Sequence, residues 1–491
     1  MNHRWRLLGT AAVSTAGLLS TPLAAGGAPG SLPLTSDPAV EQLLHPAVVV
    51  PALPQRPSEA LAAAVSDFAA SLGFRLDPTA RIAAAQLPDA VSGRLAVLVA
   101  QLGECHQVAA PARAMLGDPA VIEALAVAPA GFAAAPSAAL AETAARLKTC
   151  AARLMSLAME TSALLAAGRP VAGEALDLWP VLSYSPSLES QSYLNDYALI
   201  VDAGGDDYYR NNSGGSFLDL KRGPEGSPAP EQAPARGCHQ LNADGPNGDC
   251  TPGVALLLDG SGNDIYGTLE DPDPRDDAFC TSDQVARRIV TGGSALAGVG
   301  ILVDSAGDDR YVGKTLAQGS GHLAGVGVLR DESGDDSYLA IRNAQGFGLL
   351  AGLGILSDES GDDVFDRYLP SALDPAAPFQ RRGAGGVLDD RGSCDNLARQ
   401  MQGSGFLPGG VGILDNHSGN DIYRGPTPAI QKFDPNIEFP HGSQGYGGRG
   451  GAGALFDGGG RDAYEGVPGR ADNVSIQPGP DSAGVFSDSG S

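Results

Sequence analysis

One acidic turn is repeated along this chain, and the repeat restricts the fold more than any other feature. The stretch GVLRDESGDDSYLA at 327–340 returns as GILSDESGDDVFDR at 354–367. With the first Asp of a copy as position zero, a large apolar residue stands two places before it. Gly, Asp and an aromatic or Leu residue stand three, five and seven places after it. Nine copies begin at Asp202, Asp259, Asp304, Asp331, Asp358, Asp390, Asn416, Asp457 and Asp488.

Each copy predicts a strand, a turn with positive φ at the Gly, and a second strand. Ser393 replaces the Gly once, and the last copy stops at Ser491 before its second Asp. The residue directly before position zero varies, as Val201, Arg330 and Ser357 show, so we expect a strand with one buried face.

The spacing of the copies predicts the architecture. The copies at Asp304, Asp331 and Asp358 follow one another evenly, which indicates a basic unit of about 27 residues, and the wider gaps elsewhere indicate inserted loops. A unit of this size is one coil of a parallel β-solenoid, whose coils bury their inward faces against their neighbours. A β-propeller is the alternative, and it fits less well because so short a unit cannot supply the four strands of a blade. We expect a β-solenoid (β-helix) of about nine coils over residues 195–491.

The N-terminal part of the chain has a different pattern. Residues 1–28 read as a signal peptide, which predicts a secreted or cell-surface protein. Residues 29–56 are rich in Pro and Ala and read as a linker, and apolar residues at helical spacing predict a small helical bundle over 57–170. We expect residues 171–194 to be a connector that completes an N-terminal cap over 57–194. We therefore expect an α+β multidomain protein in which the helical region caps the first coil.

Six cysteines fit export, and they allow fifteen pairings. Cys105 with Cys150, and Cys238 with Cys250, are the candidate disulfides because each pair shares one local segment. A zinc site is the weaker alternative, since no Cys-x-x-Cys spacing occurs.

The charge of the chain favours cations as partners. Its 57 acidic residues exceed its 32 basic ones, for a net charge of −25, which argues against nucleic acid or an anionic membrane surface. No run after the signal segment is long and apolar enough to span a bilayer.

Two copies of the turn resemble a known calcium motif. DGSGNDIYG at 259–267 and DGGGRDAYE at 457–465 match the nonapeptide GGxGxDxUx of the RTX family from its second position on. In that family the glycine turns and Asp carboxylates of successive coils hold calcium, in tandem nonapeptides, whereas this chain has one acidic turn per longer coil. The resemblance implies several calcium ions bound by Asp202, Asp207, Asp259, Asp264, Asp304, Asp309, Asp331, Asp336, Asp358, Asp363, Asp395, Asp421, Asp457 and Asp462.

Stacking gives an independent reason to expect cations. Two carboxylates about 4.8 Å apart repel by about 3–4 kcal/mol at an effective dielectric constant near 20, and calcium prefers oxygen ligands. The Asp five places after the start is kept in all eight full copies. The alternative is that these side chains only cap their own turns. A second column, formed by Gln318, Gln345, Gln402 and Gln444, precedes four of the starts at nearly the same distance and predicts an amide ladder.

Two classes of function remain open. The first is a secreted, calcium-stabilised solenoid that acts as a surface, matrix or binding protein and contacts a polysaccharide or cell-surface component. The second is a polysaccharide lyase or hydrolase, with Asp271, Asp273, Arg275, Asp276 and Asp277 as a candidate loop site. The incomplete last copy also predicts an open C-terminal edge that meets a partner or another copy of the chain.

Overall fold

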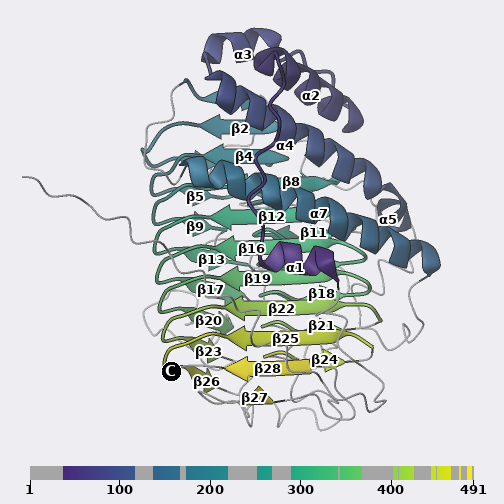
Figure 1. The fold of residues 1–491 in the computed structure, drawn as a ribbon, viewed down its shortest axis with the longest axis vertical. Coiled ribbons are helices and arrows are strands. Elements are labelled where there is room, and N and C mark those ends of the chain that lie inside the picture. Colours follow the sequence, from purple (N-terminus) through teal and green to yellow (C-terminus); the bar gives the residue numbers. More distant parts are fainter. Residues whose placement is uncertain are drawn as a thin grey trace, which may run out of the picture.

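The computed structural model describes residues 37–116, 137–165, 173–218, 251–267, 289–313, 315–340, 343–367, 402–406, 408–424, 444–448, 450–465, 475–476 and 484–488. Over these residues the chain forms an N-terminal helical region followed by long, mostly parallel sheets (Figure 1). The prediction of a parallel β-solenoid-like fold with a helical region before it is confirmed.

Six helices lie in the described N-terminal part of the chain. Pro at the first helical position begins α1 and α2, and Ala and Leu fill the longest helix, α7. The helices are α1 (Pro38–Leu44), α2 (Pro57–Ser71), α3 (Thr79–Ala85), α4 (Asp89–Val108), α5 (Ala110–Met115) and α7 (Ala138–Leu165). A disulfide joins Cys105 of α4 to Cys150 of α7, which confirms one predicted pair; Cys238 and Cys250 lie outside the described residues.

The longest sheet has eleven strands and forms one face of the solenoid. All neighbouring strands pair in parallel except at the two ends, where β1 and β27 pair antiparallel. In spatial order the strands are β1 (Leu176–Leu178), β2 (Leu182–Ser185), β4 (Leu199–Asp202), β8 (Val254–Leu258), β12 (Val299–Asp304), β16 (Val326–Asp331), β19 (Leu353–Asp358), β22 (Val411–Asn416), β25 (Ala452–Asp457), β28 (Gly484–Asp488) and β27 (Ser475–Ile476).

Two further parallel sheets form the other faces. The eight-stranded sheet, which we call the tyrosine sheet, contains β26 (Ala463–Glu465), β23 (Ile422–Arg424), β20 (Val364–Arg367), β17 (Ser337–Ala340), β13 (Arg310–Val312), β9 (Ile265–Tyr266), β5 (Tyr208–Tyr209) and β3 (Ser192–Tyr193). The five-stranded sheet contains β11 (Ala295–Leu296), β15 (Gly321–His322), β18 (Gly348–Leu349), β21 (Gly405–Phe406) and β24 (Gly447–Gly448). Two small pairs complete the strands: β10 (Ile289–Thr291) with β14 (Thr315–Ala317), and β6 (Phe217–Leu218) with β7 (Thr251–Pro252).

One coil runs from a long-sheet strand through the acidic turn into the tyrosine sheet and returns through the five-stranded sheet. Val299 of β12 pairs with Val326 of β16, which in turn pairs with Leu353 of β19, so the register advances by one repeat unit per coil where no loop is inserted. The interior is narrow: a Cβ on Gly327 would lie 2.1 Å from the Ser320 carbonyl oxygen, and one on Gly354 2.2 Å from that of Phe347. Glycine in these strands is therefore required by the close approach of opposite backbones.

The central strands of the long sheet are buried on both faces, so the prediction of a single buried face is wrong for them. All six residues of β12, β16 and β19 are buried. Inward residues such as Leu302 pack on the tyrosine rings, whereas Ile301 belongs to a core that includes the helices. Both α4 and α7 contact this sheet and cross its outer face in Figure 1. Continuous apolar strands covered by helices are the usual state of parallel sheets.

The helical region thus covers a face of the solenoid as well as its first strands. The segment 29–56, expected to be a linker, includes α1, whose Val40, Leu43 and Leu44 are buried. In addition, α1 packs on α7, where Gln42 Nε2 donates to Ser156 Oγ (2.9 Å). The described helices include none long and apolar enough to cross a bilayer.

The stack differs from the expected one at two places. The copy that begins at Asp390 lies outside the described residues, and the coils on either side of it pair directly, with Leu353 opposite Val411. The expectation that this copy forms a rung between them is therefore wrong. Conversely, β2 and β3 form an earlier coil that the repeat did not predict, with Ser185 opposite Asp202 and Tyr193 opposite Tyr209.

Candidate metal centre

The first Asp of each turn ends a long-sheet strand and caps the turn. Its Oδ1 accepts the backbone N–H two residues later, as in Asp331 with Ser333 (2.9 Å) and Asp304 with Ala306 (3.0 Å). The same bond occurs at Asp202, Asp259, Asp358 and Asp457, and Asn416 makes it with its amide oxygen. The first Asp residues therefore cap their own turns, which was the alternative interpretation of the sequence.

The other oxygen of the first Asp accepts a tyrosine hydroxyl from the preceding coil. Tyr338 donates to Asp358 Oδ2 (2.6 Å), and the same bond joins Tyr193 to Asp202, Tyr209 to Asp259, Tyr266 to Asp304 and Tyr311 to Asp331. The rings stack in parallel with centroids 4.7–4.9 Å apart from Tyr193 to Tyr464. In these five coils the tyrosine that follows the turn therefore positions the carboxylate of the next coil.

The second Asp of each turn links one coil to the preceding coil. Its Oδ1 accepts the backbone N–H of the second Asp in that coil, from Asp264 with Asp309 (2.6 Å) through Asp336 with Asp363 (2.8 Å) to Asp421 with Asp462 (2.9 Å). The Gly of the turn has φ near 150° in these coils, and its Cβ would lie about 1.5 Å from the Gly oxygen of the preceding coil, which confirms the predicted positive φ.

The other oxygen of the second Asp lacks a hydrogen-bond donor. Oδ2 of Asp207, Asp309, Asp336, Asp363 and Asp421 is buried and accepts no hydrogen bond from the described residues. These side chains are at most 2 % exposed. Buried carboxylate oxygens are normally paired, so an acceptor without a donor indicates a missing ligand or a bound proton.

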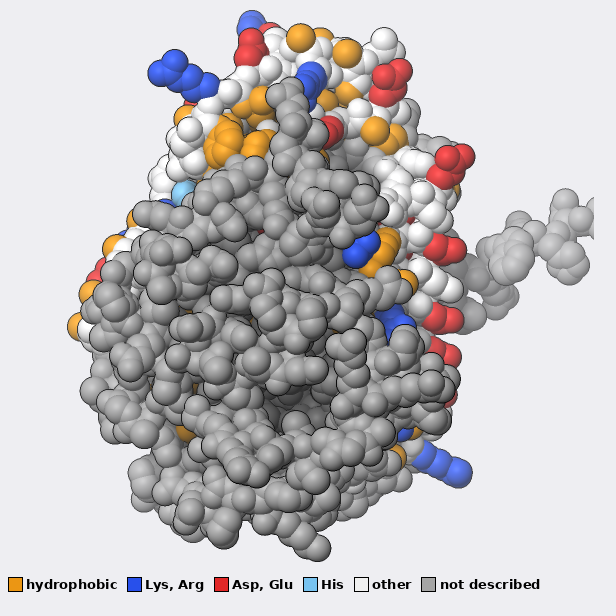
Figure 2. Space-filling view, turned by 180° about the vertical axis from the view of Figure 1, so that it is seen from behind, with side chains coloured by type: hydrophobic (Ala, Val, Ile, Leu, Met, Phe, Trp, Pro, Cys, Tyr) orange, Lys and Arg blue, Asp and Glu red, His pale blue; other side chains and the backbone are white. Residues whose placement is uncertain are grey.

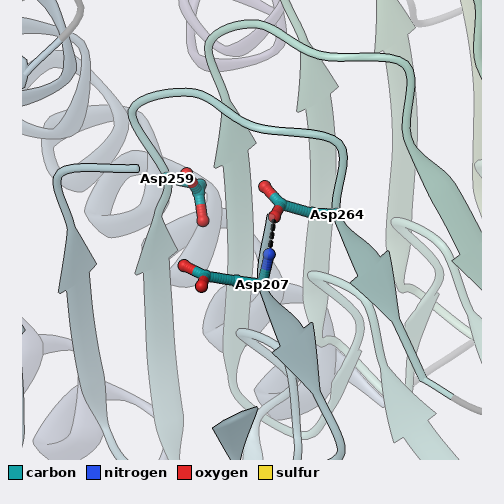
Figure 3. Close-up of side chains that lie close together, drawn as sticks. All are labelled: Asp207, Asp259 and Asp264. Atoms are coloured by element: carbon teal, nitrogen blue, oxygen red, sulfur yellow. Dashed lines mark hydrogen bonds between the residues drawn. The ribbon is translucent and has the colours of Figure 1, made fainter. Parts of the chain in front are cut away.

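The two columns of carboxylates meet in triads. Each triad combines the second Asp of one coil with both Asp residues of the next, and the three contributing oxygens lie within 4.8 Å of one another. Figure 3 shows Asp207, Asp259 and Asp264 pointing toward one another. The triads are Asp207–Asp259–Asp264, Asp264–Asp304–Asp309, Asp309–Asp331–Asp336, Asp336–Asp358–Asp363 and Asp421–Asp457–Asp462.

Burial and neighbouring charge make these carboxylates reluctant to ionise without a counter-ion. Burial, with the Asp363 and Asp457 charges nearby, raises the pKa of Asp421 to about 8, and burial raises the pKa of Asp457 to about 6. Burial and then the charge of Asp304 raise the pKa of Asp264. Desolvation and like charge act in the same direction here, so the folded protein needs protons or cations at these positions.

The donor set fits calcium. Calcium takes oxygen ligands at about 2.3–2.6 Å, so ligands on opposite sides of an ion are about 5 Å apart, close to the spread of each triad. The set contains only carboxylates, with no His or Cys, which argues against a soft metal. A triad supplies fewer than the six to eight oxygens that calcium takes, and the remainder would be second carboxylate oxygens or water.

Not every predicted ligand joins a triad. Asp202 is buried and accepts bonds from Tyr193 and Gly204, but the preceding coil has Gln191 at the place of the second Asp, and the Gln191 N–H donates to Asp207. Asp395, with the loop residues Asp271, Asp273, Arg275, Asp276 and Asp277, lies outside the described residues.

Sequence reasoning missed the tyrosine hydroxyls and assigned the Gln column incorrectly. The amides do not form a ladder: Nε2 of Gln345 donates to the backbone oxygens of Tyr338 (2.9 Å) and Asp366 (3.1 Å). Gln318 binds two carbonyls in the same way, and both residues have φ near 55°. These amides hold a left-handed corner between coils. The recurring Tyr in the repeat was the signal for the hydroxyl contact.

The fourth place of the turn faces outward. Asp206, Asp308, Asp335 and Asp362 are exposed there, and Figure 2 shows acidic side chains following one another down one edge of the described surface. Each Oδ1 in the central coils accepts the N–H of the next coil, as in Asp335 N–H with Asp308 (3.1 Å). This outer row supplies a matched comparison for the buried ones.

Comparison with family models, curated protein sequences and solved structures finds no match to this chain.

Proposed function

We propose that the protein is a secreted β-solenoid stabilised by several calcium ions bound between successive coils, and that it serves as a surface, matrix or binding protein. The RTX-like turn GGxGxDxUx supplies the analogy, with one acidic turn in each coil. The predicted signal peptide and the Cys105–Cys150 disulfide support export, because disulfides persist in oxidising compartments.

The observation that carries the proposal is the pairing of a buried carboxylate triad with an oxygen that has no donor. In the triad Asp309–Asp331–Asp336, Oδ2 of both Asp309 and Asp336 is buried and accepts no hydrogen bond from the described residues. Capping accounts for Oδ1 of Asp331, but it leaves these two oxygens without a role. A divalent cation would neutralise two of the three charges and give both oxygens a partner.

Shared protons are the competing explanation for the same geometry. Raised pKa values allow each triad to hold protons at neutral pH, and folding would then need no metal. The backbone N–H groups that donate to every second Asp favour the ionised form, since hydrogen bonds to a carboxylate stabilise its charge.

Thermal unfolding in three solutions tests the proposal. We expect millimolar calcium to raise the melting temperature well above its value in sodium chloride of equal ionic strength, and a chelator to lower it. Titration calorimetry should show heat of calcium binding. Equal melting in calcium and in chelator, without binding heat, would leave the buried columns as turn caps that hold protons.

A matched pair of substitutions locates the effect. Asp336→Asn changes a buried triad member, whereas Asp335→Asn changes its exposed neighbour in the same turn, where Asn occurs naturally at Asn263 and Asn420. The calcium-dependent rise in melting temperature should shrink for Asp336→Asn and stay unchanged for Asp335→Asn. It should shrink less for Asp462→Asn, since Asp462 belongs to one triad and Asp336 to two. Equal effects at 335 and 336 would contradict the assignment.

The binding role has its own test. The calcium-loaded protein should bind one member of a panel of acidic and neutral polysaccharides without releasing products. Release of shortened or unsaturated products would instead identify a polysaccharide lyase or hydrolase.

A further inference from the structure

One rung of the acidic column differs from the rest in two residues at once. Asn416 stands where the other coils have the first Asp, pairing with Asp358 on one side and Asp457 on the other. The ring of the preceding coil is Phe365, which stacks between Tyr338 (4.7 Å) and Tyr423 (4.9 Å). Tyr338 donates a hydrogen bond from its hydroxyl to Asp358, whereas Phe365 has no hydroxyl that could donate to Asn416.

The side chain of Asn416 carries an NH2 group where an Asp would carry its second carboxylate oxygen. Its Oδ1 accepts the Ser418 N–H (3.2 Å), as the Oδ1 of each first Asp accepts the corresponding N–H. Its Nδ2 therefore takes the place of the oxygen that accepts a tyrosine hydroxyl at the other rungs. Asn416 is 1 % exposed, and Nδ2 has no hydrogen-bond partner among the described residues. An N–H group carries partial positive charge and cannot coordinate a cation.

The second Asp on either side of this rung belongs to a triad on its own side only. Asp363 belongs to the triad with Asp336 and Asp358, and Asp421 to the triad with Asp457 and Asp462. The Asp363 N–H donates to Asp421 Oδ1 (2.7 Å), so the coils are in direct contact at this rung. Only two carboxylates and one amide are available there. A cation at this rung would therefore face two negative charges, whereas a cation in a triad faces three.

We propose that the row of cation sites is interrupted between Asp363 and Asp421, where Phe365 and Asn416 replace the tyrosine and aspartate of the other rungs. The ions are then held in two separate groups. This inference rests on the proposed calcium binding.

Charge balance agrees with this division. The four consecutive triads share three members and together hold nine carboxylates, namely Asp207, Asp259, Asp264, Asp304, Asp309, Asp331, Asp336, Asp358 and Asp363. Four divalent ions would leave this group nearly neutral. The second group, Asp421, Asp457 and Asp462, would hold one ion. At its other end the first group stops at Gln191, which is uncharged.

Two reciprocal exchanges of the residue pair test the interruption. Phe365→Tyr with Asn416→Asp restores the common pair, and we expect it to bind one more calcium ion per chain than the natural protein. Tyr311→Phe with Asp331→Asn transplants the exceptional pair into the triad Asp309–Asp331–Asp336, and we expect it to bind one ion fewer. The number of ions per folded chain is measured by native mass spectrometry in calcium, with circular dichroism as the check on folding.

The outcomes separate the two proposals. If none of the three proteins binds calcium, the proposed function fails. If the natural protein binds calcium but the restored pair adds no ion, the interruption is overturned. Should the restored variant not fold, the transplanted pair decides: an unchanged ion count there shows that the pair does not control occupancy.

Discussion

Each acidic turn contains two aspartates with different tasks. Asp331 has both oxygens occupied, one by the Ser333 N–H and one by the Tyr311 hydroxyl, so it is fixed in place. Asp336 has one oxygen held by the Asp309 N–H and one without a donor. The first Asp therefore shapes the turn and also belongs to a triad, while the second presents an oxygen without a donor. Turn capping uses Oδ1 of the first Asp, so it is compatible with cation binding through Oδ2 of the second Asp.

His322 is a buried residue that the acidic turns do not explain. It is fully buried in β15, with Leu296 and Leu349 as its partners in the neighbouring strands and the Phe347 ring 5.4 Å away. Neither ring nitrogen has a hydrogen-bond partner among the described residues, and burial lowers its pKa to about 3. The imidazole thus occupies an apolar position without compensation.

We expect His322→Leu to stabilise the protein. Leucine is of similar size and continues the apolar column of Leu296 and Leu349, and removing a buried polar group without partners should raise the free energy of unfolding by about 1–3 kcal/mol. Urea unfolding at constant calcium measures the change. A lower stability for His322→Leu would mean that the imidazole has a partner beyond the described residues.

At the scale of elements, the helices complete the long sheet. Arg94 of α4 and Glu160 of α7 form an ion pair, and Ser162 of α7 contacts Ser305 beside an acidic turn (2.6 Å between hydroxyl oxygens). With α4 and α7 in place, neither face of the central strands is open to water. The disulfide between Cys105 and Cys150 holds these two helices together across 45 residues of chain.

Replacing Cys105 and Cys150 with Ser should lower the free energy of unfolding by about 2–4 kcal/mol, because the closed loop limits the freedom of the unfolded chain. Chemical denaturation of the variant and the natural protein measures this difference. The number of bound calcium ions should not change, since neither cysteine lies in an acidic turn. An unchanged denaturation midpoint would show that packing alone fixes the two helices.

Much of the repeat could be predicted, because stacking imposes the same geometry on every coil. Gly334 and Asp336 recur at fixed places since each coil turns at the same corner in contact with the previous one. The prediction of the coils failed where the residue types changed but the backbone still stacked in the same way. Ser185 and Gln191 take the places of the two aspartates in the first coil, so the pattern of aspartates did not reveal that coil.

The copy at Asp390 departs from the repeat at two places. It has Ser393 in place of the turn glycine and Leu397 in place of the aromatic residue. A Cβ at the glycine position would overlap the backbone of the preceding coil, as at Gly361 with Gly334, where the separation would be 1.5 Å. A side chain at this place is therefore incompatible with the packing that the described turns share. The helices on the outer face were indicated by the continuous apolar strands, such as VGILV at 299–303.

At the scale of the whole molecule, the buried columns link stability to both calcium and protons. Without a cation, burial raises the pKa of Asp421 to about 8 in the folded state, above the value of about 3.9 for an unfolded Asp, so the folded protein binds more protons between these values. His106 and His322 act in the opposite sense below pH 6.5, because burial lowers their pKa. His417 bonds to Asp415 and Glu359, which raise its pKa to about 10, so it acts in the same sense as the aspartates above pH 6.5.

Between pH 6.5 and 8, the buried aspartates and His417 therefore change the stability in the same direction. In chelator, stability should fall as pH rises through this window, since the folded state must release protons that the unfolded state no longer holds; the slope is at most about 1.4 kcal/mol per pH unit for each proton. In saturating calcium the ligands are already ionised, and the decline should be smaller. Calcium binding at pH 7 should also release protons, detected as a binding heat that changes with the ionisation enthalpy of the buffer. A melting temperature in chelator that stays constant or rises from pH 6.5 to 8 would contradict this linkage, and with it the neutralising role of cations in the buried columns.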